Sequence, residues 1–193
     1  MELFEAVKER RSIHDFNRKR IEEEKLTEIF NIASWAPNHR LKEPWKVMLF
    51  QEKGTEKYAN LVIQSYINNG LTEGYEEDKQ EKMMEGIKQF LLNIPHHALI
   101  YMEKDKDLLR YEEDYAAVCA FIQNVQLIAW SYQIGVLWTT SPYIHDHSFI
   151  EGIGLNPRDH KIIGVLQMGY PKTIPRSKAR SSVPIHFVKR ALE

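Results

Sequence analysis

Apolar residues recur with the period of an α-helix early in the chain. The i, i+3, i+4, i+7 spacing of an amphipathic helix is met by Leu26, Ile29, Phe30 and Ala33. Three glutamates precede this stripe, where negative charge suits a helix start, and Pro37 follows it, where a helix has to end. Shorter periodic stretches predict further helices near residues 3–10, 58–65, 84–91 and 148–153.

The longest periodic segment predicts the longest helix. Its apolar stripe begins at Tyr115 and the helical pattern continues to Gln133, with Gly135 beyond it as a helix stop. Additional apolar residues such as Phe121 and Leu127 lie beside the stripe. A helix that is apolar on more than one side is buried centrally or at a subunit interface, so we expect one of these two places.

Four short apolar runs predict β-strands at residues 45–50, 98–102, 136–140 and 162–168. Helical stretches of unequal length separate them, which favours an α+β or mixed α/β fold over a regular βαβ array. Residues 68–82 are polar and charged and contain Gly70 and Gly74, so we interpret them as a mobile excursion or lid. The tail, residues 172–193, has too little periodicity to predict its structure.

Composition limits the class of protein. At 193 residues the chain is expected to form a single domain, residues 1–193. A net charge of −1 with scattered basic residues argues against a nucleic-acid partner, and one cysteine, Cys119, excludes an internal disulfide and a thiolate metal cluster. The chain start does not resemble a secretory signal, and no uncharged apolar run approaches the ~20 residues of a membrane span, so a cytoplasmic protein without a membrane partner is expected.

Two motifs carry most of the candidate chemistry. Arg10, Arg11 and Ser12 follow the first helix and could clamp a phosphate through forked, charge-assisted hydrogen bonds, or they could simply be a solvated helix end. A proline-punctuated turn places Asn38 and His39 on a rigid loop, where small-molecule sites are commonly built; His39 alone could equally be a turn residue.

Two further groups of residues could either bind a ligand or have an ordinary structural or surface role. Trp138, Thr139 and Thr140 end a predicted strand, where they could pack and turn the chain or present an indole and hydroxyls to an aromatic ligand. Lys178 and Arg180 could be ordinary surface charges, yet in an extended tail their spacing would let both reach one anion. No phosphate loop or dinucleotide loop occurs, so phosphate recognition by side chains suits a mononucleotide cofactor.

The histidines give weaker signals. His96 and His97 are adjacent in a predicted strand and would point to opposite faces, which disfavours chelation by the pair. His145 and His147 lack acidic or histidine partners at a supporting spacing. No metal site is therefore predicted.

Taken together, the motifs resemble those of nitroreductase-family flavoproteins, in particular the short, minimal members. The resemblance extends from Leu3 to about Val183. The segments that carry it are Arg10-Arg11-Ser12-Ile13, Ala36-Pro37-Asn38-His39, Glu43-Pro44-Trp45, Gln123-Asn124, Gly135-Val136-Leu137-Trp138 and Gly164-Val165-Leu166-Gln167-Met168-Gly169-Tyr170-Pro171. It implies an α+β, nitroreductase-like fold, with a central mixed or antiparallel sheet of about four to five strands flanked by helices, and a homodimer with FMN at the interface.

The resemblance also implies roles for the candidate residues. The FMN phosphate and ribityl chain would be contacted by Arg10, Arg11 and Ser12, and His14 stands where members often carry Arg or Lys. The same flavin would be approached from the partner subunit by Pro37, Asn38 and His39. The ring would lie against Trp138, Thr139 and Thr140, and the phosphate site would be completed by Lys178 and Arg180.

The implied activity is that of an oxidoreductase. Electrons would pass from NADH or NADPH through FMN to a nitroaromatic, quinone or similar small-molecule acceptor by a ping-pong mechanism, without a catalytic side chain from the protein. Two alternatives remain open at this point: a specialised branch of the same fold that dehalogenates a substrate or breaks down a flavin, and a flavin-binding module without turnover.

Overall fold

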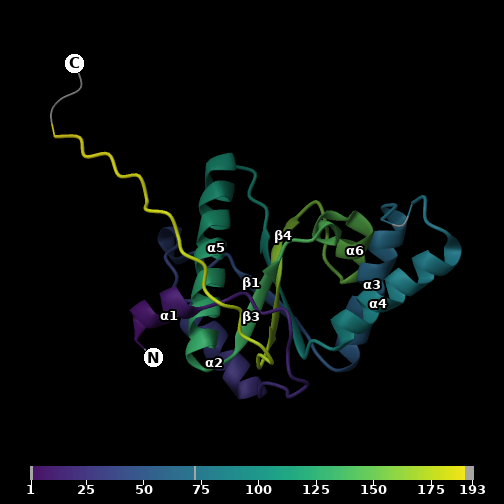
Figure 1. Cartoon of the computed structure of the whole chain (residues 1–193). Coiled ribbons are helices and arrows are strands. Elements are labelled where there is room, and N and C mark those ends of the chain that lie inside the picture. Colours follow the sequence, from purple (N-terminus) through teal and green to yellow (C-terminus); the bar gives the residue numbers. More distant parts are fainter. Residues whose placement is uncertain (1, 72, 190–193) are drawn as a thin grey trace.

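A four-stranded antiparallel sheet forms the centre of the protein (Figure 1). The computed structural model describes residues 2–71 and 73–189. The strands are β1 (Lys46–Phe50), β2 (His96–Glu103), β3 (Gly135–Thr139) and β4 (His160–Gly169), in the order β1-β2-β4-β3. In the register, Ala98 of β2 lies opposite Leu49 of β1 and Leu166 of β4. The prediction of an α+β fold with an antiparallel sheet is confirmed.

One face of the sheet packs against α2 (Glu23–Ala33) and α5 (Leu108–Ser131). Alternate residues of β2, among them Ala98 and Ile100, point to this face and meet Val118, Ile122 and Val125 of α5. These side chains are fully buried. The long helix is therefore central to the core, as its apolar pattern predicts, while its far side stays accessible.

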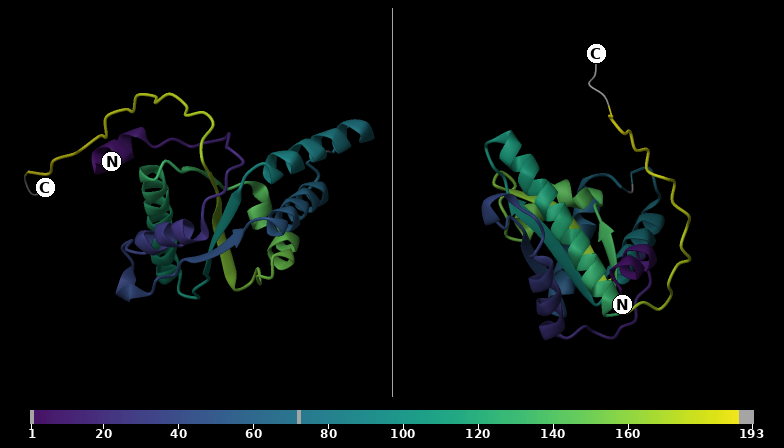
Figure 2. Two further views of the ribbon diagram at one scale, coloured as in Figure 1. Left: turned by 90° about the horizontal axis from the view of Figure 1, so that it is seen from below. Right: turned by 90° about the vertical axis from the view of Figure 1, so that its left-hand side faces the viewer.

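The opposite face packs against α3 (Lys53–Asn68), α6 (His147–Gly152) and the 3₁₀ turn η2 (Pro142–His145). Leu99 of β2 points to this face and joins Tyr58 of α3, Tyr143 of η2 and Phe149 of α6 in a second apolar cluster. The helix α4 (Glu77–Leu92) packs on α3 and projects with it from the body (Figure 2). The sheet is thus buried on both faces, which explains why its strands read as continuous apolar runs.

The N-terminal segment runs along the free edge of β3. After α1 (Leu3–Glu9), Ser12 pairs with Val136 in a short parallel bridge, and the Ile13 N–H donates to the Val136 carbonyl at 3.3 Å. Gly135 makes this approach possible, because a Cβ there would lie only 2.6 Å from Cγ1 of Ile13. The segment that carries the arginine motif is therefore fixed beside β3.

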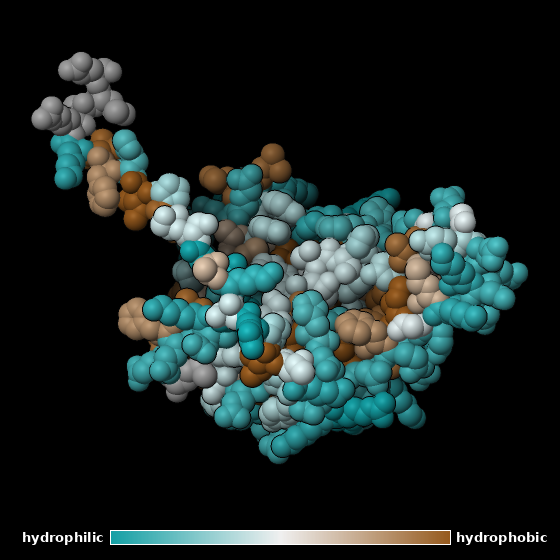
Figure 3. Space-filling model, viewed as in Figure 1, coloured by the Kyte–Doolittle hydropathy of each residue, from teal (hydrophilic) through white to brown (hydrophobic). Residues whose placement is uncertain are grey.

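Residues 172–189 form an exposed, extended tail without helix or strand (Figures 1 and 2). The tail passes α1 and leaves the body, and apolar side chains stand exposed along it (Figure 3). None of the helices in the described residues has both the length and the apolar composition of a membrane span.

Two sequence interpretations need correction. Residues 68–82 are not one polar excursion, because α3 continues to Asn68 and α4 begins at Glu77 with an acidic first turn; Thr72 lies outside the described residues. Gly135 is not the helix stop, since α5 ends at Ser131 and the positive-φ residue beyond it is Gln133, at φ 60°. Gly135 instead begins β3, where it is needed for close packing.

Candidate functional site

Three arginines from the two ends of the chain approach one another. Arg10 and Arg11 follow α1, and Arg180 lies far along the tail, yet the charge of Arg180 is close enough to act on Arg10. Burial, then the neighbouring Arg11 and Arg180, lower the pKa of the Arg10 guanidinium. The structure therefore brings together three of the residues predicted to bind phosphate.

Among the described residues, these cations have no carboxylate partner. Arg10 Nη1 donates to Gln126 Oε1 of α5 at a long 3.4 Å, and its buried Nε has no hydrogen-bond partner among the described atoms. Arg11 Nη1 donates to the carbonyls of Lys8 and Arg10, both at 2.7 Å. No ion pair within the described residues includes Arg10, Arg11 or Arg180. The cluster thus has the charge and the free donors that a doubly charged anion requires.

Ser12 and His14 lie on the same segment and are exposed, with Ser12 held beside β3 by its bridge to Val136. Lys178 is exposed on the tail two residues before Arg180. Within the described structure, the side chains of Ser12, His14 and Lys178 form no hydrogen bond with the arginine cluster. Their proposed contacts with a phosphate group stay predictions.

The end of β3, the strand whose start this segment contacts, carries hydroxyl groups. Thr139 Oγ1 and Ser141 Oγ share a hydrogen bond at 2.8 Å, and Thr140 between them is exposed. Trp138 is half-buried and packs on Gly164 of β4, leaving no room for a Cβ there. The indole of Trp138 therefore fills the space above Gly164. Its buried N–H has no hydrogen-bond partner among the described atoms.

The loop with Pro37, Asn38 and His39 lies at the other end of α5. Asn38 holds the loop itself: its Oδ1 accepts the Glu43 N–H at 2.9 Å, and its Nδ2 donates to the Ala36 carbonyl at 3.2 Å. His39 lies 3.9 Å from the Glu113 carboxylate of α5, and Pro37 is exposed. Arg10 contacts the same helix at Gln126, thirteen residues or about 20 Å further along. Within one chain, this loop and the arginine cluster are therefore apart.

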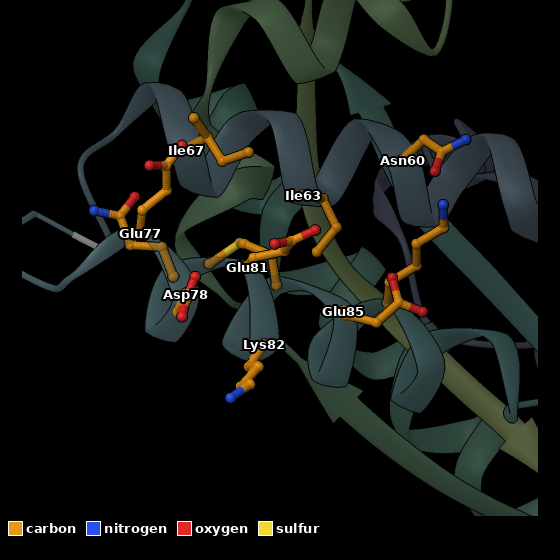
Figure 4. Close-up of a pocket in the computed structure, with 11 residues that line it drawn as sticks. Asn60, Ile63, Ile67, Glu77, Asp78, Glu81, Lys82 and Glu85 are labelled. Carbon is orange, nitrogen blue, oxygen red and sulfur yellow. The ribbon is translucent and has the colours of Figure 1, made fainter.

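A hollow with a volume of about 1130 Å³ lies elsewhere, between α3 and α4 (Figure 4). It contains none of the predicted site residues. Ile63 and Ile67 of α3 face a row of α4 carboxylates that includes Glu81 and Glu85. Negative walls repel a phosphate, so this groove does not suit a phosphorylated cofactor.

Sequence reasoning missed three contributors. Gln126 lies on the buried side of α5 and contacts Arg10. Tyr66 of α3 packs edge-on against Tyr143 of η2, with 5.9 Å between the ring centroids. Lys42 pairs with the buried carboxylate of Asp114 and fixes the loop after Asn38 to α5. A helical stripe gives no sign of such roles, because its period reports only which face is buried.

Comparisons with known proteins identify relatives of the chain. A model of the nitroreductase family matches residues 7–170. A Bacillus subtilis protein with the name "Putative NAD(P)H nitroreductase YfhC" is 28% identical over 188 residues, covering 97% of this chain and 93% of the relative.

Solved structures show the same fold. A nitroreductase-like family protein from Bacillus cereus is 36% identical, with a TM-score of 0.84 and coverage of 94% of this chain and 92% of that one. The FMN-dependent nitroreductase NfnB of Mycobacterium smegmatis, solved with NADPH, is 15% identical, with a TM-score of 0.68 and coverage of 93% and 97%; this likeness concerns the fold alone. Because the family model matches most of its length and its fold is that of the solved structures, the chain belongs to the nitroreductase family.

Proposed function

We propose that the protein is an FMN-dependent oxidoreductase that passes electrons from NAD(P)H to nitroaromatics, quinones or similar acceptors in a ping-pong cycle. The observation that carries this proposal is the cluster of Arg10, Arg11 and Arg180, which converges without a carboxylate partner in the described residues. Like charges at close range destabilise a fold unless a ligand neutralises them. The phosphate of FMN supplies two negative charges and the acceptor oxygens that the free guanidinium donors need.

The neighbouring residues suit the remainder of the cofactor. Ser12 is fixed beside β3, and Thr139 and Thr140 end that strand, so a molecule with its phosphate at the arginines would extend along this edge. Bound FMN would supply hydride chemistry. The NfnB of Mycobacterium smegmatis described above is FMN-dependent and was solved with NADPH. The role of this chain is then to bind the phosphate, orient the ring and leave one ring face open to the nicotinamide or the acceptor.

The site is proposed to be completed by a second copy of the chain. A twofold axis that crosses α5 would set two copies of that helix antiparallel, which moves the partner's loop 37–39 toward the arginine cluster. Apolar side chains are widely exposed on the surfaces concerned, including Phe4 of α1 and Phe187 of the tail, at 79% and 72%. Exposed apolar surface of this extent favours a protein partner.

The test is a titration of FMN-free protein with FMN, followed by anaerobic addition of NADH or NADPH. Tight binding, a yellow protein and loss of the flavin absorption on reduction are expected, and a quinone or nitroaromatic should then restore the absorption. Binding without reduction by either nicotinamide would favour the binding-module alternative. A protein that takes up no FMN would refute the proposal.

The variant Arg10→Gln tests whether the arginine cluster binds the FMN phosphate. FMN affinity should fall by at least tenfold, because a charge-assisted hydrogen bond contributes about 1.5–3 kcal/mol. The FMN-free variant should unfold at the same temperature or higher, since like-charge repulsion is removed. Arg158→Gln, at an exposed position before β4, is the matched control and should bind FMN as the wild type does. Unchanged FMN affinity in Arg10→Gln would contradict the phosphate assignment.

A further inference from the structure

The segment that carries Arg10 is anchored to the C-terminal part of α5. Ala6 of α1 and Ile13, which follows the arginines, pack with Trp130 of α5 in a separate apolar cluster, and all three side chains are buried. The backbone of Arg10 is therefore held on both sides. Its side chain meets Gln126, which lies one turn of α5 before Trp130 and so on the same side of that helix.

Gln126 is the residue of α5 that accepts a hydrogen bond from this guanidinium. The residue is only 5% exposed, and its Nε2 donates to Gln123 Oε1 at 3.4 Å, which directs its own Oε1 toward Arg10. Arg10 Nη1 donates to that oxygen, also at 3.4 Å. Both hydrogen bonds are long and therefore weak, so they orient the side chains more than they immobilise them.

This contact engages only one edge of the Arg10 guanidinium. Nη1 lies on the side of Cδ, whereas Nε and Nη2 direct their hydrogens to the other side and form a fork that matches two oxygens of one phosphate group. Nε is buried, and neither Nε nor Nη2 donates a hydrogen bond among the described residues. The fork of Arg10 therefore has no partner in the part of the chain that the structure describes.

An amide at position 126 leaves the charge of Arg10 intact, which a carboxylate would not do. A half-buried charge is costly unless it is paired, so a carboxylate is the usual partner of such a guanidinium. Glutamate has the same length as glutamine and would neutralise Arg10 from this position. Gln126 accepts the same hydrogen bond without carrying a charge, so Arg10 keeps its full attraction for an anion.

We propose that Gln126 is a positioning residue that makes the site selective for the phosphorylated flavin. Its neutral amide orients the Arg10 guanidinium through Nη1 and leaves the positive charge and the Nε–Nη2 fork to the phosphate. This inference rests on the proposed function, because it requires the FMN phosphate to bind at Arg10.

The experiment compares the binding of FMN with that of riboflavin, which is the same flavin without the phosphate. FMN-free protein is titrated with each compound, and the ratio of the two dissociation constants isolates the contribution of the phosphate. In the wild type this ratio should be at least tenfold in favour of FMN. A residue that only stabilises the fold would change both dissociation constants together and leave their ratio unchanged.

Two substitutions of Gln126 should lower this ratio to different extents. Gln126→Met has a similar length but no acceptor, so Arg10 must be ordered when FMN binds; FMN affinity should fall by about two- to tenfold. Gln126→Glu neutralises Arg10 and repels the phosphate, so FMN affinity should fall by at least a further tenfold. Riboflavin affinity should change less than twofold in both variants. Should Gln126→Glu fail to fold, the ratio for Gln126→Met decides.

Two further variants serve as controls. Gln64→Glu adds the same negative charge at an exposed position of α3 and should leave the FMN affinity within twofold of the wild type. In an Arg10→Gln background, Gln126→Met should weaken FMN binding no further, because it acts only through Arg10.

The outcomes separate this inference from the proposed function. Wild-type protein that binds no FMN would remove the basis of both. Wild-type protein that binds FMN, together with a Gln126→Glu variant that matches Gln64→Glu in FMN affinity, would overturn the positioning role alone. Equal losses of FMN and riboflavin affinity in the Gln126 variants would also overturn it, because they would show a structural role that does not involve the phosphate.

Discussion

Two adjacent histidines of β2 are buried on opposite faces of the sheet. His96 Nε2 accepts the backbone N–H of Ile21 at 2.9 Å, and His97 Nε2 lies 2.9 Å from the Leu91 carbonyl, to which it donates. The Nδ1 atom of each ring is buried without a partner among the described residues. Burial lowers the pKa of each histidine to about 4. Both side chains are therefore neutral structural residues at neutral pH.

This burial predicts a loss of stability in mild acid. Between about pH 6.5 and pH 4 the unfolded chain binds protons that the folded chain does not, so the free energy of unfolding falls as the pH falls. Each histidine contributes up to about 1.4 kcal/mol per pH unit. Urea unfolding at pH 7, 5.5 and 4.5 measures the slope. His97→Phe should be less stable at pH 7 but should show a shallower slope, and an unchanged slope would contradict this assignment.

Gly135 is the glycine on which the site depends most directly. Gly135→Ala would place a Cβ 2.6 Å from Ile13 Cγ1 and force the N-terminal segment away from β3. Overpacking of this kind costs about 1–3 kcal/mol, measured as a loss in the free energy of unfolding. Gly86→Ala is the control, because Gly86 lies in α4 with open space around it, and it should stabilise the protein by about 0.5–1 kcal/mol. Equal effects of the two substitutions would refute the close-packing argument.

At the level of elements, the loop between α2 and β1 is under backbone strain. Arg40, Leu41 and Glu43 all have positive φ angles, of 52°, 54° and 49°. Non-glycine residues persist in this region only when their surroundings hold them there. Asn38 closes the loop from within. Lys42 fixes the loop to α5 through Asp114, whose side chain is only 5% exposed, and also pairs with Asp105 just before that helix.

Lys42 is therefore expected to stabilise the loop as a unit. The hydrogen bonds that Lys42 donates to the carboxylates of Asp114 and Asp105 raise the pKa of Lys42, so it is charged at neutral pH. Lys42→Met leaves the buried Asp114 carboxylate without its cation and should cost about 1–3 kcal/mol in the free energy of unfolding. Lys46→Met removes the exposed pair with Glu103 and should cost less than about 1 kcal/mol. Chemical denaturation of both variants tests the difference, and equal losses would exclude the anchoring role.

The elements that the sequence predicts well are those with a strong period or a continuous apolar run. The four strands lie within about two residues of their predicted bounds, because the sheet packs against apolar clusters on both faces. The starts of α3 and α4 were placed too late, since Lys53 and Glu77 begin each helix on a charged, solvated turn without apolar residues. Strand β2 begins at His96 rather than Ala98, because burial of two polar rings is invisible to an apolar pattern.

The residues of the candidate site also divide into those that the sequence pattern predicts and those that it does not. Arg10 and Arg11 stand out because two guanidinium groups end a helix, and the pattern predicts their role. The approach of Arg180 to Arg10 depends on the path of a tail without periodicity, so only the resemblance to a family suggested it. The place of Tyr66 could not be predicted, since its ring contact with Tyr143 joins two elements that are distant in the sequence.

At the scale of the whole molecule, the tail is the part that the described chain leaves without a partner. Four exposed apolar side chains of the tail follow Arg180 in the sequence, namely Val183, Ile185, Phe187 and Val188. An extended segment of this kind makes no core of its own, yet burying such a side chain stabilises a complex by about 1.5–3 kcal/mol. A second copy of the chain is the partner that the proposed site requires.

Ending the chain after Arg180 therefore separates dimerisation from phosphate binding. The shortened protein keeps all three arginines but loses the four apolar side chains, so its dimer dissociation constant should rise by at least a hundredfold. Sedimentation over a range of concentrations measures this. FMN affinity should then fall only at concentrations where the shortened protein is monomeric, whereas a chain ending after Val188 should behave as the wild type. A shortened protein that is monomeric yet binds FMN as tightly as the full chain would show that one chain forms the entire site, and the proposal of a shared site would fail.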